Sequence, residues 1–207
     1  MSKLSINYIA ILLAALLWFV MFSPWTAIYL NFWLTMSCSA LLLTIIAFTI
    51  DKALLQQIKF SWKGLLLGMA IAIVLWCVFW IGDKLSQIIF SFARSQVDNI
   101  YAMKEGNNPY MIGALLLCLI GPAEEIFWRG FLQRRFSEKM GANVAMVVTL
   151  ICYTLIHIWS FNFMLIMAAF TAGLVWGLLY RLIPNQLFAL VVSHAIWDLL
   201  AFVIIPL

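Results

Sequence analysis

The residues of this chain that could do chemistry are few, and all lie in its C-terminal half. Only 10% of its 207 residues are charged, and it has two histidines. Five acidic or histidine side chains fall inside strongly apolar stretches: Glu124, Glu125, His157, His194 and Asp198. Ionisable groups are rare in such surroundings and usually functional or paired. Carboxylates together with imidazoles are an adequate set for activating water against an amide.

The spacing of these residues divides them into roles. Residues four apart on a helix face the same side, which aligns three pairs. The pairs are Glu125 with Arg129, Tyr153 with His157, and His194 with Asp198. Glu124 is five residues from Arg129 and points elsewhere. An ion pair between Glu125 and Arg129 would therefore leave Glu124 free to face another group.

The division of roles predicts a hydrolytic site. Three helices that each carry one polar stripe are best satisfied when the stripes face one another around a wet cavity. There, Glu124 could act as the general base on a water molecule, and a histidine could share or shuttle the proton. The second histidine, oriented by Asp198, could donate a hydrogen bond to the developing oxyanion.

These residues resemble three motifs of one family. The segment 124–130, Glu-Glu-Ile-Phe-Trp-Arg-Gly, is similar to the EExxxR motif of the CPBP (Abi) family of CAAX proteases and bacteriocin-processing intramembrane proteases. Tyr153-x-x-x-His157 resembles its FxxxH motif, and His194-x-x-x-Asp198 resembles its HxxxN or HxxxD motif. The resemblance covers roughly residues 109–200, the core helices of that family, and leaves the first hundred residues unmatched.

The resemblance implies a role for each residue. Glu124 and His157 would activate the hydrolytic water, and His194 and Asp198 would stabilise the oxyanion. Glu125 and Arg129 would form a structural ion pair at the site.

Two positions depart from the motifs. Tyr153 stands where the family usually has Phe, which adds a hydroxyl group. Asp198 stands where the best-studied eukaryotic-type members have Asn. An Asp donates to an oxyanion only when protonated, so Asp198 is expected to orient His194 instead.

The elements that must position these residues are transmembrane helices. Hydrophobic residues make up 66% of the chain, and a helix needs roughly 20 apolar residues to cross a membrane. We predict an all-α, polytopic membrane protein with about seven crossings, eight being the alternative, in a single domain over residues 1–207. The spans are expected near 4–22, 26–50, 64–82, 109–135, 142–159, 161–182 and 186–206.

The basic residues predict the orientation in a cell (plasma) membrane. Short cytoplasmic loops carry an excess of Lys and Arg. With the N-terminus inside and the C-terminus outside, nine of the twelve basic residues lie on or near the cytoplasmic side. These are Lys3, Lys52, Lys59, Lys63, Arg129, Arg134, Arg135, Lys139 and Arg181.

The segment 83–108 is too polar to cross. Leu85, Ile88, Ile89 and Phe92 recur in it at helical spacing among polar residues, which predicts an amphipathic helix on the outer interface. A re-entrant hairpin is the less favoured alternative.

The spans also pose a problem of depth. In straight helices, Glu124 lies about 21 Å from Tyr110 at the outer face and His157 about 22 Å from Ala142 at the inner face. In a ~30 Å slab they would miss each other by more than about 10 Å. Shifted boundaries, a bend at Gly121-Pro122, or a loop at 139–142 that enters the membrane would each remove the mismatch.

Cofactors and partners follow from the same residues. No H-E-x-x-H pattern is present, so we expect no cofactor, with zinc a minority alternative. The four cysteines lie in apolar spans and are expected to pack. The net charge of +4 is explained by topology and anionic lipid, so membrane lipids are expected partners and nucleic acid is not. The sequence does not indicate an oligomeric state.

The predicted function is that of an intramembrane endopeptidase acting on a peptide or lipid-anchored protein substrate. Prenylated proteins and bacteriocin-like peptides are both compatible substrates. Two rival functions stay open. One is a non-catalytic membrane immunity or scaffold protein that retains the polar cluster for stability. The other is a proton or ion carrier that uses the same groups.

Overall fold

The computed structural model describes residues 3–207, with side chains from residue 6 onward, and these residues form helices and turns. Six helices are long and apolar enough to cross a membrane, and Ile6–Phe22 is a shorter apolar helix. The predicted all-helical, polytopic fold is confirmed. The α-helices are α1 Lys3–Phe22, α2 Phe32–Ile50, α3 Leu54–Gln57, α4 Trp62–Ile89, α5 Ala93–Ala102, α6 Pro109–Leu115, α7 Gly121–Glu125, α8 Arg134–Met140, α9 Ala142–Leu155, α10 Phe163–Leu182 and α11 Leu187–Leu199.

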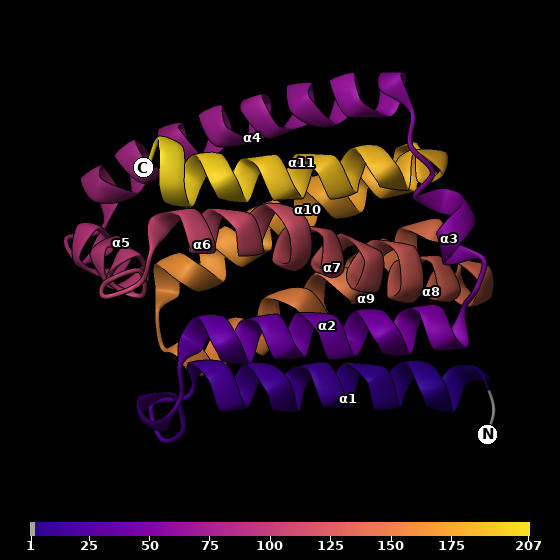
Figure 1. The fold of residues 1–207 in the computed structure, drawn as a ribbon, viewed down its shortest axis with the longest axis horizontal. Coiled ribbons are helices and arrows are strands. Elements are labelled where there is room, and N and C mark those ends of the chain that lie inside the picture. The colour runs from indigo at the N-terminus through magenta and orange to yellow at the C-terminus, as the bar shows by residue number, and fades with distance from the viewer. Residues whose placement is uncertain (1–2) are drawn as a thin grey trace.

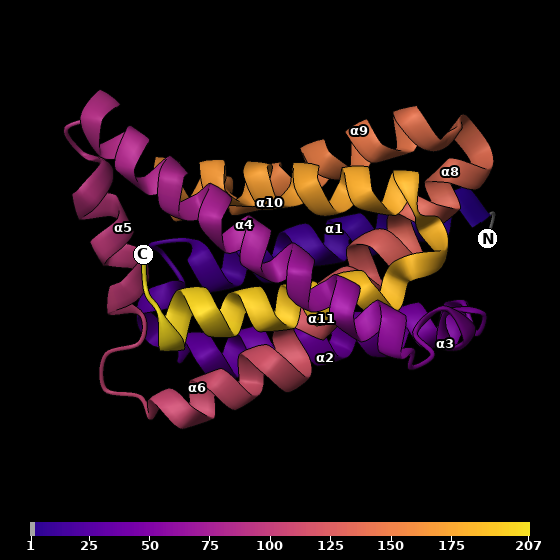
Figure 2. The same ribbon diagram turned by 90° about the horizontal axis from the view of Figure 1, so that it is seen from above.

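The helices lie roughly along one axis, and the start of α1 and the C-terminus lie at opposite ends of the bundle (Figure 1). Helices α1 and α2 lie side by side along one edge, α4 covers α11 along the opposite edge, and α6, α7 and α8 run between them. Seen from above, α9 and α10 form another side of the bundle, and α6 is oblique to α11 (Figure 2).

Short helical segments of other types join the α-helices. Segments Leu116–Ile120, Ile126–Gln133 and Leu200–Ile204 are π-helical, and Ala27–Tyr29, Ile156–Ser160 and Pro184–Gln186 are 3-10 turns. The long crossing Pro109–Met140 therefore alternates between α and π geometry.

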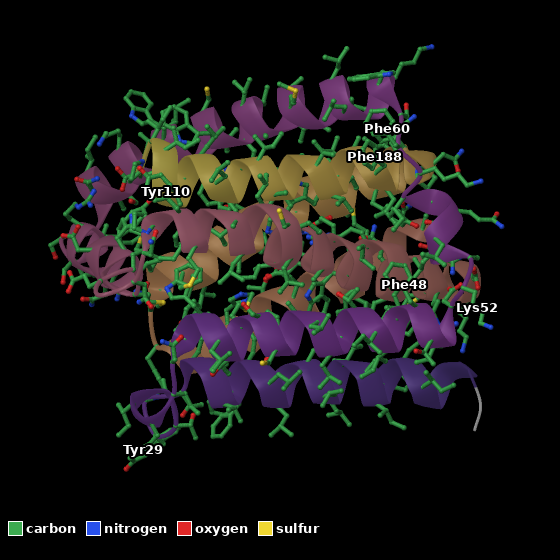
Figure 3. All side chains as sticks on the ribbon, viewed as in Figure 1. Tyr29, Phe48, Lys52, Phe60, Tyr110 and Phe188 are labelled. Carbon is green, nitrogen blue, oxygen red and sulfur yellow. The ribbon has the colours of Figure 1, made fainter. Side chains whose placement is uncertain are left out.

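Polar caps define where several crossings begin. The side chains of Asn31, Ser61, Asn108 and Asn162 each accept a backbone N–H from the first turn of the helix that follows. A side-chain oxygen at this position satisfies one of the N–H groups left without a partner at a helix start. Apolar side chains cover the outer faces between these ends, with Tyr29 and Lys52 at opposite ends of the bundle (Figure 3).

The structure corrects the predicted boundaries of the second and third crossings. The second crossing begins at Phe32 instead of residue 26 because Ser23 to Leu30 form turns. The third crossing continues to Ile89 instead of ending at 82. Within it, Asp83 accepts a hydrogen bond from Gln87 one turn later at 2.6 Å, which supports the helix through this polar stretch.

The interfacial segment also differs in detail from the prediction. Leu85, Ile88 and Ile89 belong to the end of α4, whose 28 residues span about 42 Å, more than a ~30 Å hydrocarbon core. The separate helix is α5, which buries Ala93 and Val97.

Candidate active site

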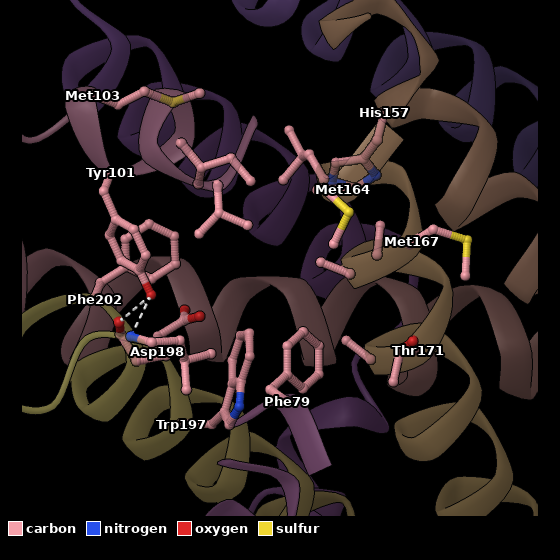
Figure 4. Close-up of a pocket in the computed structure, with 18 of the residues that line it drawn as sticks. Phe79, Tyr101, Met103, His157, Met164, Met167, Thr171, Trp197, Asp198 and Phe202 are labelled. Carbon is pink, nitrogen blue, oxygen red and sulfur yellow. Dashed lines mark hydrogen bonds between the residues drawn. The ribbon is translucent and has the colours of Figure 1, made fainter. Parts of the chain in front are cut away.

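A cavity of about 390 Å³ lies between the helices. Its walls are mainly aromatic and aliphatic, from residues of α1, α2, α4, α5, α10 and α11. Four of the predicted site residues line it: Glu124, His157, His194 and Asp198. In Figure 4, His157 and Asp198 face this space from opposite sides. Each of the three helices predicted to carry a polar stripe therefore contributes a side chain to one cavity, although Glu125 and Arg129 do not line it.

The crossing that carries Glu124 is not a regular helix. Helix α7 lies between two π segments, in which i→i+5 bonds replace the i→i+4 bonds of an α-helix. The crossing also extends to Met140, five residues beyond its predicted end. Glu124 and His157 line the same cavity, so the expected mismatch in depth does not occur.

Close packing of α7 against α11 sets the position of the two glutamates. A Cβ atom on Gly121 would lie 2.8 Å from the Cα of Ala195, closer than real contacts allow. Ala195 directly follows His194, so this glycine lets the helix with Glu124 and Glu125 approach the helix with His194. Small residues commonly permit such contact between membrane helices.

We expect Gly121→Ala to lower the free energy of unfolding by about 1–3 kcal/mol, because the added methyl group overpacks the α7–α11 contact. Thermal unfolding in detergent measures this. Gly82→Ala is the matched control, since nothing lies within 4 Å of a Cβ there. The control should be neutral or stabilising by up to about 1 kcal/mol. Equal stability of the two variants would contradict this account of the contact.

Glu124 is held by a residue from another helix. Its Oε2 accepts a hydrogen bond from the hydroxyl of Tyr153 at 2.7 Å, and Glu124 is 8% exposed. The hydroxyl that distinguishes Tyr153 from the usual Phe of the motif thus contacts the predicted general base. The contact is between α7 and α9, so residue spacing within one helix could not reveal it.

The carboxylate of Glu125 contacts two basic side chains, Arg129 and His194. Its Oε1 accepts hydrogen bonds from Arg129 Nη1 at 2.7 Å and lies 2.9 Å from Nδ1 of His194. Both Glu125 and Arg129 are almost fully buried. Arg129 also donates to the carbonyl of Gly173 at 3.2 Å and lies over the ring of Tyr153. The ion pair between Glu125 and Arg129 is therefore one part of a buried network that includes His194.

The setting of His194 differs from the predicted one. Its Nε2 lies 3.7 Å from Oδ2 of Asp198, too long for a direct hydrogen bond. The ring is oriented by Glu125 at Nδ1 and stacks on Trp176, with 3.8 Å between ring centroids. In this structure Glu125 orients His194, in place of Asp198.

The imidazole ring of His157 makes two hydrogen bonds. Its Nδ1 is 2.8 Å from the carbonyl oxygen of Tyr153, and its Nε2 accepts from the indole N–H of Trp18 at 3.1 Å. Trp18 belongs to α1, far from the motifs in sequence, and sequence reasoning did not identify it. A single Trp inside an apolar helix belongs to no motif or spacing that would identify it as a site residue.

The donors of the site are not arranged to bind a metal. Within the part of the chain that the structure describes, no three His, Cys, Asp or Glu side chains are grouped as metal ligands. The four cysteines in this part are free thiols.

The fold and the site together define a class. The chain is a multi-pass membrane protein with a buried cluster of glutamate and histidine that borders a cavity inside the bundle. Comparison with family models shows a resemblance over part of the chain: residues 106–200 match the model described as type II CAAX prenyl endopeptidase Rce1-like. Over this region the sequence is similar to that family of CAAX prenyl endopeptidases, which are peptide hydrolases. No curated protein and no solved structure matches the chain.

Proposed function

We propose that the protein is an intramembrane endopeptidase that hydrolyses a peptide bond in a peptide or lipid-anchored protein. The observation that carries the proposal is the convergence of Glu124, His157, His194 and Asp198 on one apolar-walled cavity. These residues come from three helices within the matched region. A packing role alone does not require them to border the same open space.

Glu124 is the proposed general base. Tyr153 holds one carboxylate oxygen and thereby orients the other for a water molecule. The water oxygen attacks the carbonyl carbon of the scissile bond while its proton passes to Glu124. When the tetrahedral intermediate collapses, the C–N bond breaks and Glu124 returns the proton to the leaving nitrogen.

His194 is the proposed donor to the oxyanion. With Nδ1 donating to Glu125, the ring has a proton on Nε2 to donate only as an imidazolium. Glu125 and Asp198 flank the ring, and their two negative charges would balance Arg129 and the imidazolium. Asp198 thus has an electrostatic role, consistent with its distance from Nε2.

The substrate enters a cavity whose lining is mainly apolar and includes Glu124, His157, His194 and Asp198. Such a lining suits an apolar peptide segment or the end of a lipid-anchored chain, so prenylated proteins and bacteriocin-like peptides remain the two candidate substrate classes. We also propose that the end of the bundle with Lys52 faces the cytoplasm, because basic residues concentrate in the loops there.

The proposal is tested with purified protein in liposomes and a peptide panel that includes prenylated and non-prenylated members. We expect site-specific cleavage of at least one class, detected by mass spectrometry. Proton flux across the same liposomes is measured in parallel. Flux without any cleavage would favour the ion-carrier function, and absence of both with intact fold would favour an immunity or scaffold protein.

Chelation gives an independent check. We expect cleavage to be unchanged after treatment with a metal chelator, because the carboxylates and imidazoles are not grouped as metal ligands and water activation by Glu124 requires no ion. The cleavage rate before and after chelation is the measurement. A loss that added zinc reverses would contradict the glutamate mechanism.

A further inference from the structure

The hydrogen bonds of His157 determine which of its ring nitrogens carries the proton. A backbone carbonyl can only accept, so the nitrogen near the carbonyl of Tyr153, Nδ1, must donate. An indole N–H can only donate, so Nε2, which faces Trp18 at 3.1 Å, has no proton of its own. His157 is therefore a neutral imidazole whose two nitrogens are both engaged.

The surroundings leave the ring little freedom to turn. His157 is 6% exposed and Trp18 is 1% exposed. The rings of Trp18, Phe22 and Tyr153 surround the imidazole, with centroids 5.2 to 6.0 Å away. A flip of the ring would break both hydrogen bonds inside this aromatic enclosure, and unpaired polar groups are costly there.

The contact with Trp18 occupies the lone pair that His157 would need as a base. An imidazole whose Nδ1 carries a proton accepts another one only at Nε2. The indole N–H lies at that nitrogen, where a proton of water would otherwise be received. Trp18 is contributed by α1, outside the matched region 106–200.

We propose that Trp18 is a positioning residue of this site. It fixes His157 as the neutral tautomer protonated on Nδ1 and withholds the Nε2 lone pair from water until the indole moves away. In the resting site, both ring nitrogens of His157 are engaged. Of the two predicted water-activating residues, only Glu124 then has a lone pair available to water. The inference rests on the proposed function, because it states how α1 controls a residue of that reaction.

Histidine NMR tests the hydrogen bond without any assay of activity. The chain has two histidines, so selective ¹⁵N labelling gives four ring-nitrogen signals. His157→Gln identifies its pair by their loss. In the otherwise unchanged protein we expect one protonated nitrogen and one unprotonated acceptor. Trp18→Phe, which keeps an aromatic ring but removes the N–H, should shift the acceptor signal.

Trp33→Phe is the matched control. Trp33 is also buried at the cavity, and its indole N–H donates to the carbonyl of Met103 instead of to a histidine. This variant should leave the His157 signals in place. If Trp18→Phe does not fold, the benzothiophene analogue of tryptophan at position 18 removes the N–H with little change of shape. Unchanged acceptor signals in a folded variant, or equal changes in Trp33→Phe, would overturn the proposal.

Cleavage provides the second readout. If His157 activates water together with Glu124, as the sequence predicts, the indole must leave Nε2 before His157 can act. Freeing Nε2 should then raise kcat about fivefold in the Trp18 variant, the effect of one net hydrogen bond. A kcat at or below that of the unchanged protein, with Nε2 shown to be free, would overturn the withholding role. If the unchanged protein cleaves no peptide but the NMR result holds, the assigned hydrogen bond stands and the proposed function fails, so the two failures are distinguishable.

Discussion

Replacing Glu124 by Gln is expected to lower the rate of peptide cleavage by about 10²–10⁴-fold, the usual contribution of a general base. The amide keeps the shape of the side chain, and its oxygen can still accept from the hydroxyl of Tyr153. It cannot take a proton from water at neutral pH. The fold should therefore persist while the chemistry fails. Initial cleavage rates, with thermal unfolding measured on the same samples, test this expectation.

Glu138→Gln is the matched control for that experiment. The same substitution is made near the end of α8, where the side chain is 60% exposed and lies 3.9 Å from Arg134. We expect cleavage by this variant to match that of the unchanged protein. Full activity of Glu124→Gln would remove Glu124 from the role of base, whatever the control shows.

The largest effect on stability is expected for Glu125→Ala, at about 3–5 kcal/mol of unfolding free energy. The substitution leaves Arg129 buried with its charge unbalanced and removes the acceptor from Nδ1 of His194. Burial makes the loss large, because Arg129 is 1% exposed and bulk water does not screen its unpaired charge. Chemical or thermal unfolding in detergent measures the change.

Asp98→Ala breaks an ion pair of the same spacing in an exposed setting. Arg94 and Asp98 are also four residues apart on a helix, but their side chains are 44% and 58% exposed. Water and salt screen such a pair, so about 0–1 kcal/mol is expected. If Glu125→Ala unfolded no more easily than Asp98→Ala yet lost all activity, our division of labour between the two glutamates would be wrong.

Local periodicity made much of the fold predictable from sequence. Apolar runs of sufficient length identified the crossings to within a few residues in most cases. The structure contains the Glu125–Arg129 pair at the four-residue spacing from which it was predicted. The end of α4 was missed because Asp83 and Lys84 resemble the start of a loop, whereas Gln87 bonds Asp83 within the helix.

Contacts between helices limited the prediction of the site. The motifs identified four residues that border the cavity, and their roles remain predictions. The hydrogen bonds from Tyr153 to Glu124 and from Trp18 to His157 join residues 29 and 139 positions apart. Neither leaves a local pattern in the sequence. A regular helical projection of the Glu124 region likewise does not contain the π segments on either side of α7.

The most direct test of the central claim is a single turnover in H₂¹⁸O, followed by mass spectrometry of both products and enzyme. If Glu124 acts as a general base on water, one ¹⁸O enters the new carboxyl group of the peptide and none enters Glu124. Attack by the Glu124 carboxylate itself would form an anhydride, whose hydrolysis can place ¹⁸O in the enzyme. Label in Glu124, or no cleavage of any peptide, would contradict the account.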